Sequence, residues 1–166
     1  MIVHAGLIAL RMGGAWRGVL IEGPSGAGKT DLALRCLADG FRMVADDRTL
    51  IWLSGGRVFG RAPDALAGRV EVRGLDVVEE PAAPFAEVAL VARCEPAERI
   101  PEPQFEERLG MALPLLRVAP LEASAPQKLR RALHHLGRRP QQAYQTGSAA
   151  RFLPSWGRKV PLRESE

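Results

Sequence analysis

Cysteine and histidine are both scarce in this 166-residue sequence. The two cysteines, Cys36 and Cys94, are too few for the disulfide framework of a small secreted protein. The three histidines, His4, His134 and His135, have no cysteines at zinc-binding spacing, and adjacent histidines do not share a helix face. We therefore expect neither a disulfide scaffold nor a structural zinc site.

Long apolar runs are also missing. The longest ones, near residues 3–10 and 85–92, are far shorter than the roughly 20 residues that span a bilayer. The amino terminus lacks the basic region and long apolar segment of a secretory signal. The sequence therefore predicts a soluble, cytoplasmic protein with no membrane partner.

Lysine is limited to three residues and asparagine is absent, whereas arginine is abundant and the net charge is +4. Much of the positive excess lies beyond residue 127, without an aromatic-lined sheet or a recognition motif for nucleic acid. We therefore predict no nucleic-acid partner. We interpret residues 1–137 as one domain and residues 138–166 as a basic, flexible tail.

A complete Walker A motif is the clearest feature that the sequence does contain. An apolar segment at 16–21 precedes it, and a helical pattern follows from Gly28 until Gly40. This strand, loop and helix context is the one that the motif requires. The motif consists of Gly23, Pro24, Ser25, Gly26, Ala27, Gly28, Lys29 and Thr30.

The Walker A residues predict binding of ATP together with Mg²⁺. Backbone N–H groups of such a loop surround the phosphates, and the following helix adds the positive end of its dipole. Lys29 would neutralise the β- and γ-phosphates, and the hydroxyl of Thr30 would reach Mg²⁺. A plain strand-to-helix turn is the alternative interpretation.

Two carboxylates, Asp46 and Asp47, follow an apolar strand expected at residues 41–45. Ligands of open α/β sheets bind beyond the carboxyl ends of strands. Successive strand residues face opposite sides, so one carboxylate could orient Mg²⁺ and the other could accept a proton. An exposed Asp-Asp turn is the alternative.

Three further candidates each have a structural alternative. Glu71 and Arg73 share one face of an alternating segment at 69–73, which suits metal and phosphate contact but also a solvated charged stripe. His4 lies in an apolar run, where a half-buried structural histidine is the common case.

The remaining pattern predicts a hairpin at 51–59 that turns at residues 54–56 and an apolar strand at 85–92. The stretch 95–103, with three prolines, is expected to be a loop. A helix is expected at 127–136, because Pro126 favours its first turn and Gly137 its end.

Several of these segments together resemble the carboxy-terminal catalytic domain of bacterial HPr kinase/phosphorylase, across residues 1 to about 80 and in the family's order. The Walker A loop alone is generic, whereas the segments at 40–47 and 71–75 in register are far more specific. The matching pieces are His4, the loop at 23–30, Gly-Phe-Arg-Met-Val-Ala-Asp-Asp at 40–47, Gly-Arg-Ala-Pro at 60–63 and Glu-Val-Arg-Gly-Leu at 71–75.

The resemblance implies an α/β fold of the P-loop kinase type with a mixed β-sheet, similar to phosphoenolpyruvate carboxykinase. It implies an ATP-dependent serine kinase acting on a small HPr-like phosphocarrier protein, and a homo-oligomer, hexameric in the family. Asp47 would act as general base, with His4 and Lys29 as further active-site groups. Thr30 and Glu71 would hold Mg²⁺, and we place Asp46 with these metal ligands.

The chain departs from the family pattern at three places. The opening hairpin, expected from apolar segments at 2–10 and 16–21 on either side of a turn at 11–15, is four residues longer between His4 and Lys29 than in the family. Residues 79–87 contain no counterpart of the family's later catalytic arginine. Residues 119–124, Ala-Pro-Leu-Glu-Ala-Ser, replace an Arg-Pro-Gly-Arg-Asn-like segment that the family uses for dephosphorylation. The reverse phosphorylase activity is therefore not expected.

Two other functions fit the same motif. One is a kinase for a small molecule, which would need a lid or second lobe to exclude water. The other is a nucleotide-binding regulatory module without catalysis. An ATPase and protein-kinase assay, with and without a carrier protein, separates the three.

The Walker A interpretation predicts that Lys29→Ala severely weakens binding of Mg-ATP, because the substitution removes the positive charge that faces the phosphates. Isothermal titration calorimetry of the wild type and the variant measures the effect. Equal affinities would contradict the interpretation.

Overall fold

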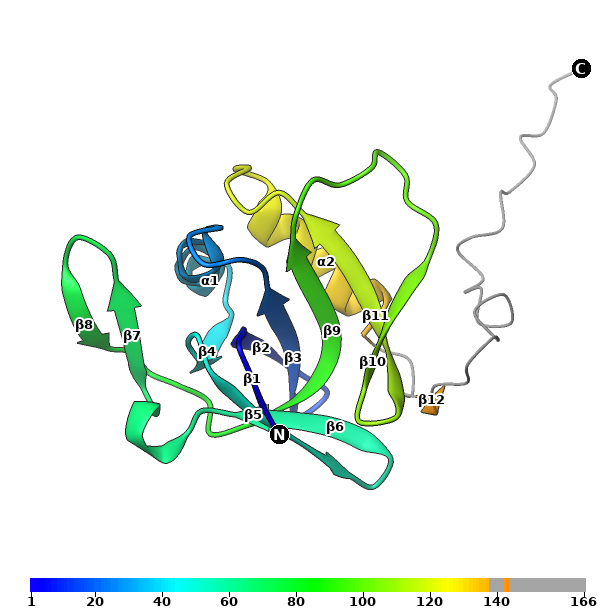
Figure 1. Ribbon diagram of the computed structural model, residues 1–166, viewed down its shortest axis with the longest axis horizontal. Helices are drawn as coiled ribbons and strands as arrows, with labels where there is room; N and C mark the ends of the chain where they lie inside the picture. Colours follow the sequence, from blue (N-terminus) through cyan, green and yellow to red (C-terminus); the bar gives the residue numbers. More distant parts are fainter. Residues whose placement is uncertain (138–141, 144–166) are drawn as a thin grey trace, which may run out of the picture.

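The computed structural model describes residues 1–137 and 142–143, which form a curled mixed sheet, two helices and a separate two-stranded arm (Figure 1). The helices are α1 (Lys29–Ala38) and α2 (Ala125–His135), and Asp64–Leu66 form one 3₁₀ turn. The strands are β1 (Ile2–Val3), β2 (Gly6–Met12), β3 (Ala15–Glu22), β4 (Arg42–Ala45), β5 (Thr49–Ser54), β6 (Arg57–Arg61), β7 (Arg69–Val72), β8 (Asp76–Glu79), β9 (Ala86–Cys94), β10 (Gln104–Arg108), β11 (Met111–Val118) and β12 (Gln142–Ala143).

Strand β9 is the centre of the sheet. It pairs in parallel with β3 on one side. On its other side its first residues pair with β6 and its last four with β11, so the sheet branches there. All of β9 is buried except Arg93, which explains its nearly continuous apolar sequence.

Both helices cover the same face of the sheet. Leu32 and Cys36 of α1 and Leu129 and Leu133 of α2 are buried in one hydrophobic core with residues of β2, β3 and β9. These positions recur at helical spacing, so each helix presents one apolar stripe to the sheet. This packing holds the amino terminus of α1 beside the end of β3.

The opposite face of the sheet is closed by hairpins rather than by helices. A second core contains Leu7 and Val88 together with Ile51, Val58 and Leu113 from the β5–β6 and β10–β11 hairpins. The sheet curls so that these hairpins fold over its second face (Figure 1). Among the described residues, two helices and these hairpins are therefore enough to cover two apolar layers.

Strands β7 and β8 form a two-stranded sheet that stands apart from the main one (Figure 1). A lone two-stranded ribbon is marginally stable in water, so it needs support from the body. Val70 supplies this support, because it is completely buried against the helical core.

Most of the predicted elements are confirmed, including the opening hairpin, both helices and the β5–β6 hairpin. The turn of the opening hairpin, Gly13–Gly14, lies at the far end of the strands from His4 and Lys29, so added length there leaves both in place. Strands β8, β10 and β11 were not predicted from the sequence. Most of the predicted tail at 138–166 lies outside the described residues.

Neither α1 nor α2, the helices of the described residues, has the length and apolar character that a membrane span needs.

The central position of β9 predicts a large loss of stability in Leu90→Ala. Leu90 is fully buried, and leucine-to-alanine changes in cores cost about 2–5 kcal/mol. Leu53→Ala on β5 is the matched control, because Leu53 is 48% exposed and its truncation should cost about 0.5 kcal/mol or less. Urea denaturation measures both, and equal losses would contradict the placement of β9.

Candidate active site

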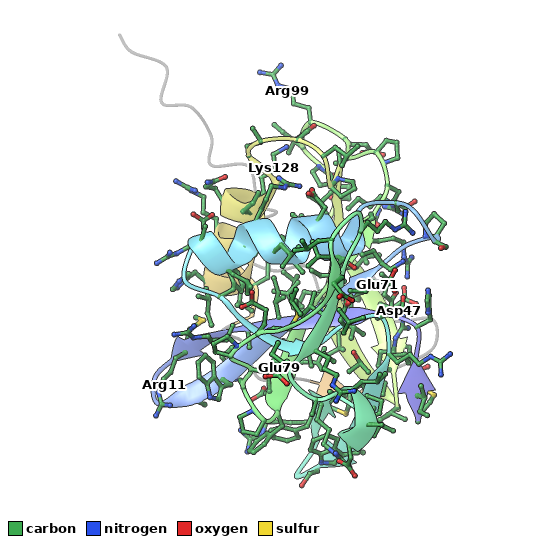
Figure 2. All side chains as sticks on the ribbon, turned by 90° about the vertical axis from the view of Figure 1, so that its left-hand side faces the viewer. Arg11, Asp47, Glu71, Glu79, Arg99 and Lys128 are labelled. Atoms are coloured by element: carbon green, nitrogen blue, oxygen red, sulfur yellow. The ribbon has the colours of Figure 1, made fainter. Side chains whose placement is uncertain are left out.

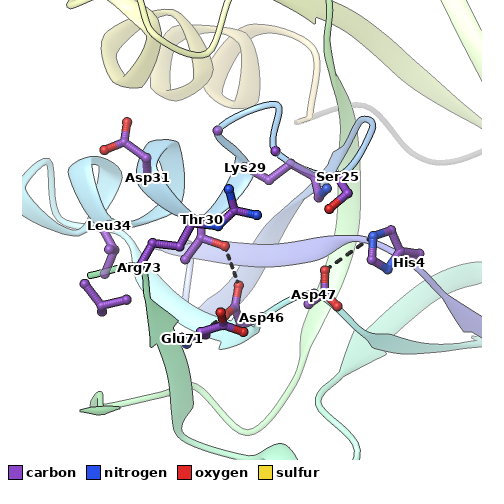
Figure 3. A pocket seen from close by; sticks show the side chains of 13 residues that line it. His4, Ser25, Lys29, Thr30, Asp31, Leu34, Asp46, Asp47, Glu71 and Arg73 are labelled. Carbon is purple, nitrogen blue, oxygen red and sulfur yellow. Dashed lines mark hydrogen bonds and ion pairs between the residues drawn. The ribbon is translucent and has the colours of Figure 1, made fainter. Parts of the chain in front are cut away.

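One pocket of about 330 Å³ collects the chemistry-bearing residues at the end of β3 and β4 (Figure 3). The phosphate loop forms one wall, and the bend after β4 and the β7–β8 arm form the others. The lining residues are His4, Ser25, Gly26, Gly28, Lys29, Thr30, Asp31, Leu34, Asp46, Asp47, Glu71, Val72 and Arg73.

The phosphate loop depends on glycine at both of its ends. Gly28 adopts a left-handed conformation, with φ of 97°, directly before the first residue of α1. A Cβ atom on Gly23 would lie 2.8 Å from Cβ of Cys94 on β9. Larger residues would therefore strain the first turn of the helix or separate the loop from β9.

Lys29 and Thr30 turn toward opposite sides of the loop. Lys29 is 8% exposed, and its Nζ donates hydrogen bonds to the carbonyl oxygens of Gly23 at 2.9 Å and Pro24 at 3.0 Å. Thr30 Oγ1 donates to Oδ1 of Asp46 at 3.1 Å. The loop thus has a cation on its inner side and a hydroxyl facing the carboxylates.

Asp46 links three segments of the chain. Its Oδ1 accepts the hydrogen bond from Thr30, and its Oδ2 accepts one from the backbone N–H of Glu71 at 3.1 Å. Burial raises the pKa of Asp46 above its usual value, and the nearby charges of Asp47 and Glu71 raise it further, against the lowering effect of the two hydrogen bonds. Excess negative charge at this point favours a bound cation.

Asp47 points away from Asp46 and toward His4. Its Oδ1 lies 3.4 Å from Nε2 of His4, and both side chains are 57% exposed. The divergence does not come from strand alternation, because β4 ends at Ala45. It comes from a bend in which Asp47 adopts a left-handed conformation with φ of 56°, which aspartate tolerates better than most residues.

Pairing between β1 and β5 brings His4 to Asp47. Val3 is paired with Thr49, and Thr49 Oγ1 donates to the carbonyl oxygen of Ala5 at 2.8 Å. His4 follows the end of β1, and Asp47 precedes the start of β5, so antiparallel pairing places them together. The half-buried structural histidine weighed as an alternative for His4 is wrong, since the imidazole is exposed on the pocket.

Arg73, which the sequence offered together with Glu71 as a candidate for phosphate or metal contact, also lines the pocket. Its Nη1 lies 3.9 Å from the position of a Cβ atom on Gly26, so the guanidinium reaches over the phosphate loop from the arm (Figure 3). In the described part of the chain it has no hydrogen-bond or ion-pair partner. The alternation at 69–73 had placed it on the same face as Glu71, which was the available signal.

Oxygen donors suited to Mg²⁺ converge on one side of the pocket: Thr30 Oγ1 and the carboxylates of Asp46 and Glu71. Within residues 1–137 and 142–143, no three histidine, cysteine or acidic side chains surround a single metal position. Mg²⁺ commonly takes only one or two carboxylates from protein, with phosphate oxygens and water completing its shell. The donor set therefore fits Mg²⁺ bound together with a phosphate ligand.

The pocket unites nearly all the residues selected from the sequence. His4, Lys29, Thr30, Asp46, Asp47 and Glu71 line it, together with Ser25, Gly26 and Gly28 of the loop. Gly23, Pro24 and Ala27 belong to the loop but do not line the pocket. Figure 2 shows Asp47 and Glu71 beside each other below α1.

Comparison with known proteins agrees with this geometry. Residues 2–83 match the family described as the HPr Serine kinase C-terminal domain. The HPr kinase/phosphorylase of Clostridium tetani is 42% identical over 64 residues, which are 39% of this chain and 21% of that protein. That of Mycoplasmopsis pulmonis is 39% identical over 62 residues, 37% of this chain and 20% of that protein. The alignments thus span about a fifth of the length of these curated relatives.

The fold also resembles a solved structure over most of its length. The Hpr(Ser) kinase/phosphatase from Coxiella burnetii matches with a TM-score of 0.68 and 20% identity, covering 81% of this chain and 88% of that one. The expected α/β fold of the P-loop kinase type with a mixed sheet is confirmed.

The raised pKa of Asp46 predicts a pH-dependent difference between the wild type and Asp46→Asn. A carboxyl whose pKa is higher in the folded protein contributes stability that is fully present below the unfolded value of 3.8 and is lost as pH rises through the folded value. The uncharged variant has no such loss. Its melting temperature relative to wild type should rise as the pH is raised above about 4. A difference that does not change with pH would contradict the burial of this carboxylate.

Proposed function

Residues 2–83 of this chain belong to the HPr serine kinase C-terminal domain family, and on that premise we propose an ATP-dependent serine kinase whose substrate is a small, HPr-like phosphocarrier protein. The observation that carries the proposal is the separation of two carboxylates. Asp46 is engaged with the phosphate loop, whereas Asp47 is held 3.4 Å from His4 at the exposed side of the same pocket.

ATP binding rests on the phosphate loop. Its backbone N–H groups and the amino terminus of α1 surround the phosphates, and Lys29 neutralises the β- and γ-phosphates. Arg73 reaches the loop from the opposite wall and adds a second positive charge near the transferred group. Thr30, Asp46 and Glu71 would hold Mg²⁺, which when bound supplies further neutralisation of phosphate charge.

Asp47 is the general base for the acceptor hydroxyl. It takes the serine proton as the serine oxygen forms a bond to the γ-phosphorus and the bond from that phosphorus to the β–γ bridging oxygen of ATP breaks, which leaves ADP. His4 lies beside Asp47 and orients its carboxylate. An ion pair between two side chains this exposed adds little to stability, so a role in orientation accounts better for its position.

A protein acceptor suits this site better than a metabolite. Asp47 and His4 are both more than half exposed, so a loop of a folded partner can bring a serine to them directly. The β7–β8 arm borders the pocket on one side only, and no second lobe among the described residues closes over it. We propose the forward kinase reaction without the reverse phosphorylase reaction, because residues 79–87 contain no counterpart of the family's later catalytic arginine.

We also propose that the chain forms a homo-oligomer, a hexamer by family resemblance. Analytical ultracentrifugation would test this proposal.

The proposed division of roles predicts opposite phenotypes for the two neighbouring carboxylates. Asp47→Asn should leave the affinity for Mg-ATP nearly unchanged and lower kcat for phosphorylation of the carrier protein by about a hundredfold or more, the usual contribution of a general base. Asp46→Asn should weaken Mg-ATP binding first. Calorimetry and steady-state kinetics on both variants decide the assignment. A fully active Asp47→Asn beside an inactive Asp46→Asn would reverse it.

A further inference from the structure

The two sides of the phosphate loop differ in chemistry. On the side of β4 and the arm lie the carboxylates, His4 and Arg73. On the side of β9 and β11 lie Cys94, which contacts the start of the loop, and Pro120 with Leu121, which contact its end. A Cβ atom on Gly28 would lie 3.1 Å from Cδ2 of Leu121 and 3.7 Å from Cγ of Pro120. This second side is apolar.

Leu121 is exposed although it touches the loop. It is 76% exposed and belongs to neither hydrophobic core. Leu34 and Val72, the apolar residues of the catalytic pocket, are by contrast packed against the helical core. A single exposed leucine on a protein surface needs no explanation. An exposed leucine that is fixed in position against the phosphate loop indicates a function.

The turn that carries Leu121 is held firmly in place. Arg35 of α1 donates hydrogen bonds to the carbonyl oxygens of Pro120 and Glu122, and the Glu122 carboxylate pairs with Lys128 of α2. Both helices thus fix the turn relative to the loop. Figure 2 shows Lys128 on the other side of α1 from Asp47 and Glu71, which places the turn away from the site of phosphoryl transfer.

The direction of a bound nucleotide follows from these two sides. The γ-phosphate must lie near Asp47 for transfer, with Thr30 and Asp46 beside the β- and γ-phosphates. The α-phosphate and the nucleoside therefore extend away from the carboxylates, toward β9, β11 and the turn. A flat apolar base gains stability by covering exposed aliphatic surface.

We propose that the Pro120–Leu121 turn is the base-binding surface of the nucleotide site, with Leu121 packing against the purine of ATP. The inference rests on the proposed function, since it needs a nucleotide at the loop. It gives residues 119–124 a role in binding the substrate base in place of the family's charged segment.

The test compares ATP with inorganic tripolyphosphate, which has the phosphates but no base, each titrated calorimetrically with Mg²⁺ present. Leu121→Ser, which removes the apolar contact without adding charge beside the phosphates, should weaken ATP binding by about five- to tenfold, the loss expected for most of one apolar side-chain contact, and leave tripolyphosphate binding unchanged. Leu53→Ser, at an exposed leucine on β5, is the matched control and should change neither affinity. Leu121→Trp should add a fluorescence signal that ATP quenches and tripolyphosphate does not.

Each other outcome is decisive. Equal losses for ATP and tripolyphosphate in Leu121→Ser would show that the turn supports the loop rather than the base, and would overturn the inference. Unchanged ATP affinity in Leu121→Ser, with no response of the tryptophan variant, would overturn it as well. If wild type binds tripolyphosphate and ATP equally, no base site exists. Failure of wild type to bind ATP at all would instead contradict the proposed function.

Discussion

The carboxylate of Asp46 is the contact on which the site depends, because it joins the phosphate loop, the end of β4 and the β7–β8 arm. It accepts hydrogen bonds from the hydroxyl of Thr30 and from the backbone N–H of Glu71. Burial and the neighbouring charges of Asp47 and Glu71 raise the pKa of this carboxyl in spite of the two hydrogen bonds. The protein retains a carboxylate that is costly to ionise at the place where a cation would relieve the cost, which is typical of a functional site.

Parallel pairing of β3 with β9 fixes the other side of the site. Glu22, the last residue of β3, forms an ion pair with Arg108 of β10 at 2.5 Å and one with Arg93 of β9 at 3.4 Å. These ion pairs connect the end of β3, where the phosphate loop begins, to β9 and to the β10–β11 hairpin. Residues beyond position 83, where the family match ends, therefore support the phosphate loop.

Much of the site could be predicted from the sequence because its parts are local motifs. The Walker A loop and the alternation at 69–73 each encode their own geometry. The opposite directions of the Asp46 and Asp47 side chains were predicted from strand alternation, which is the wrong reason. They result from the left-handed conformation of Asp47 in a bend, and no pattern in the sequence indicates it. The exposure of His4 depends on pairing between β1 and β5, which is a contact between distant segments.

The missed hairpin β10–β11 shows the same limit. The strand pattern is weakened by prolines at 101 and 103 and by Pro114 within β11. Two arginines of the hairpin form ion pairs outside it, Arg108 with Glu22 of β3 and Arg117 with Glu95 after β9. Tertiary contacts, not local preference, form this hairpin. The position of Leu121 against Gly28, on which its proposed role rests, is likewise a contact between distant segments that no local pattern predicts.

The central claim is transfer of phosphate from ATP to a serine of a phosphocarrier protein. The most direct measurement is intact-protein and peptide mass spectrometry of an HPr-like carrier after incubation with the wild-type chain and Mg-ATP, with Lys29→Ala in a parallel reaction. The account predicts one added phosphate on a single serine with the wild type and none with the variant. An unmodified carrier with the wild type, or equal modification by both proteins, would contradict it.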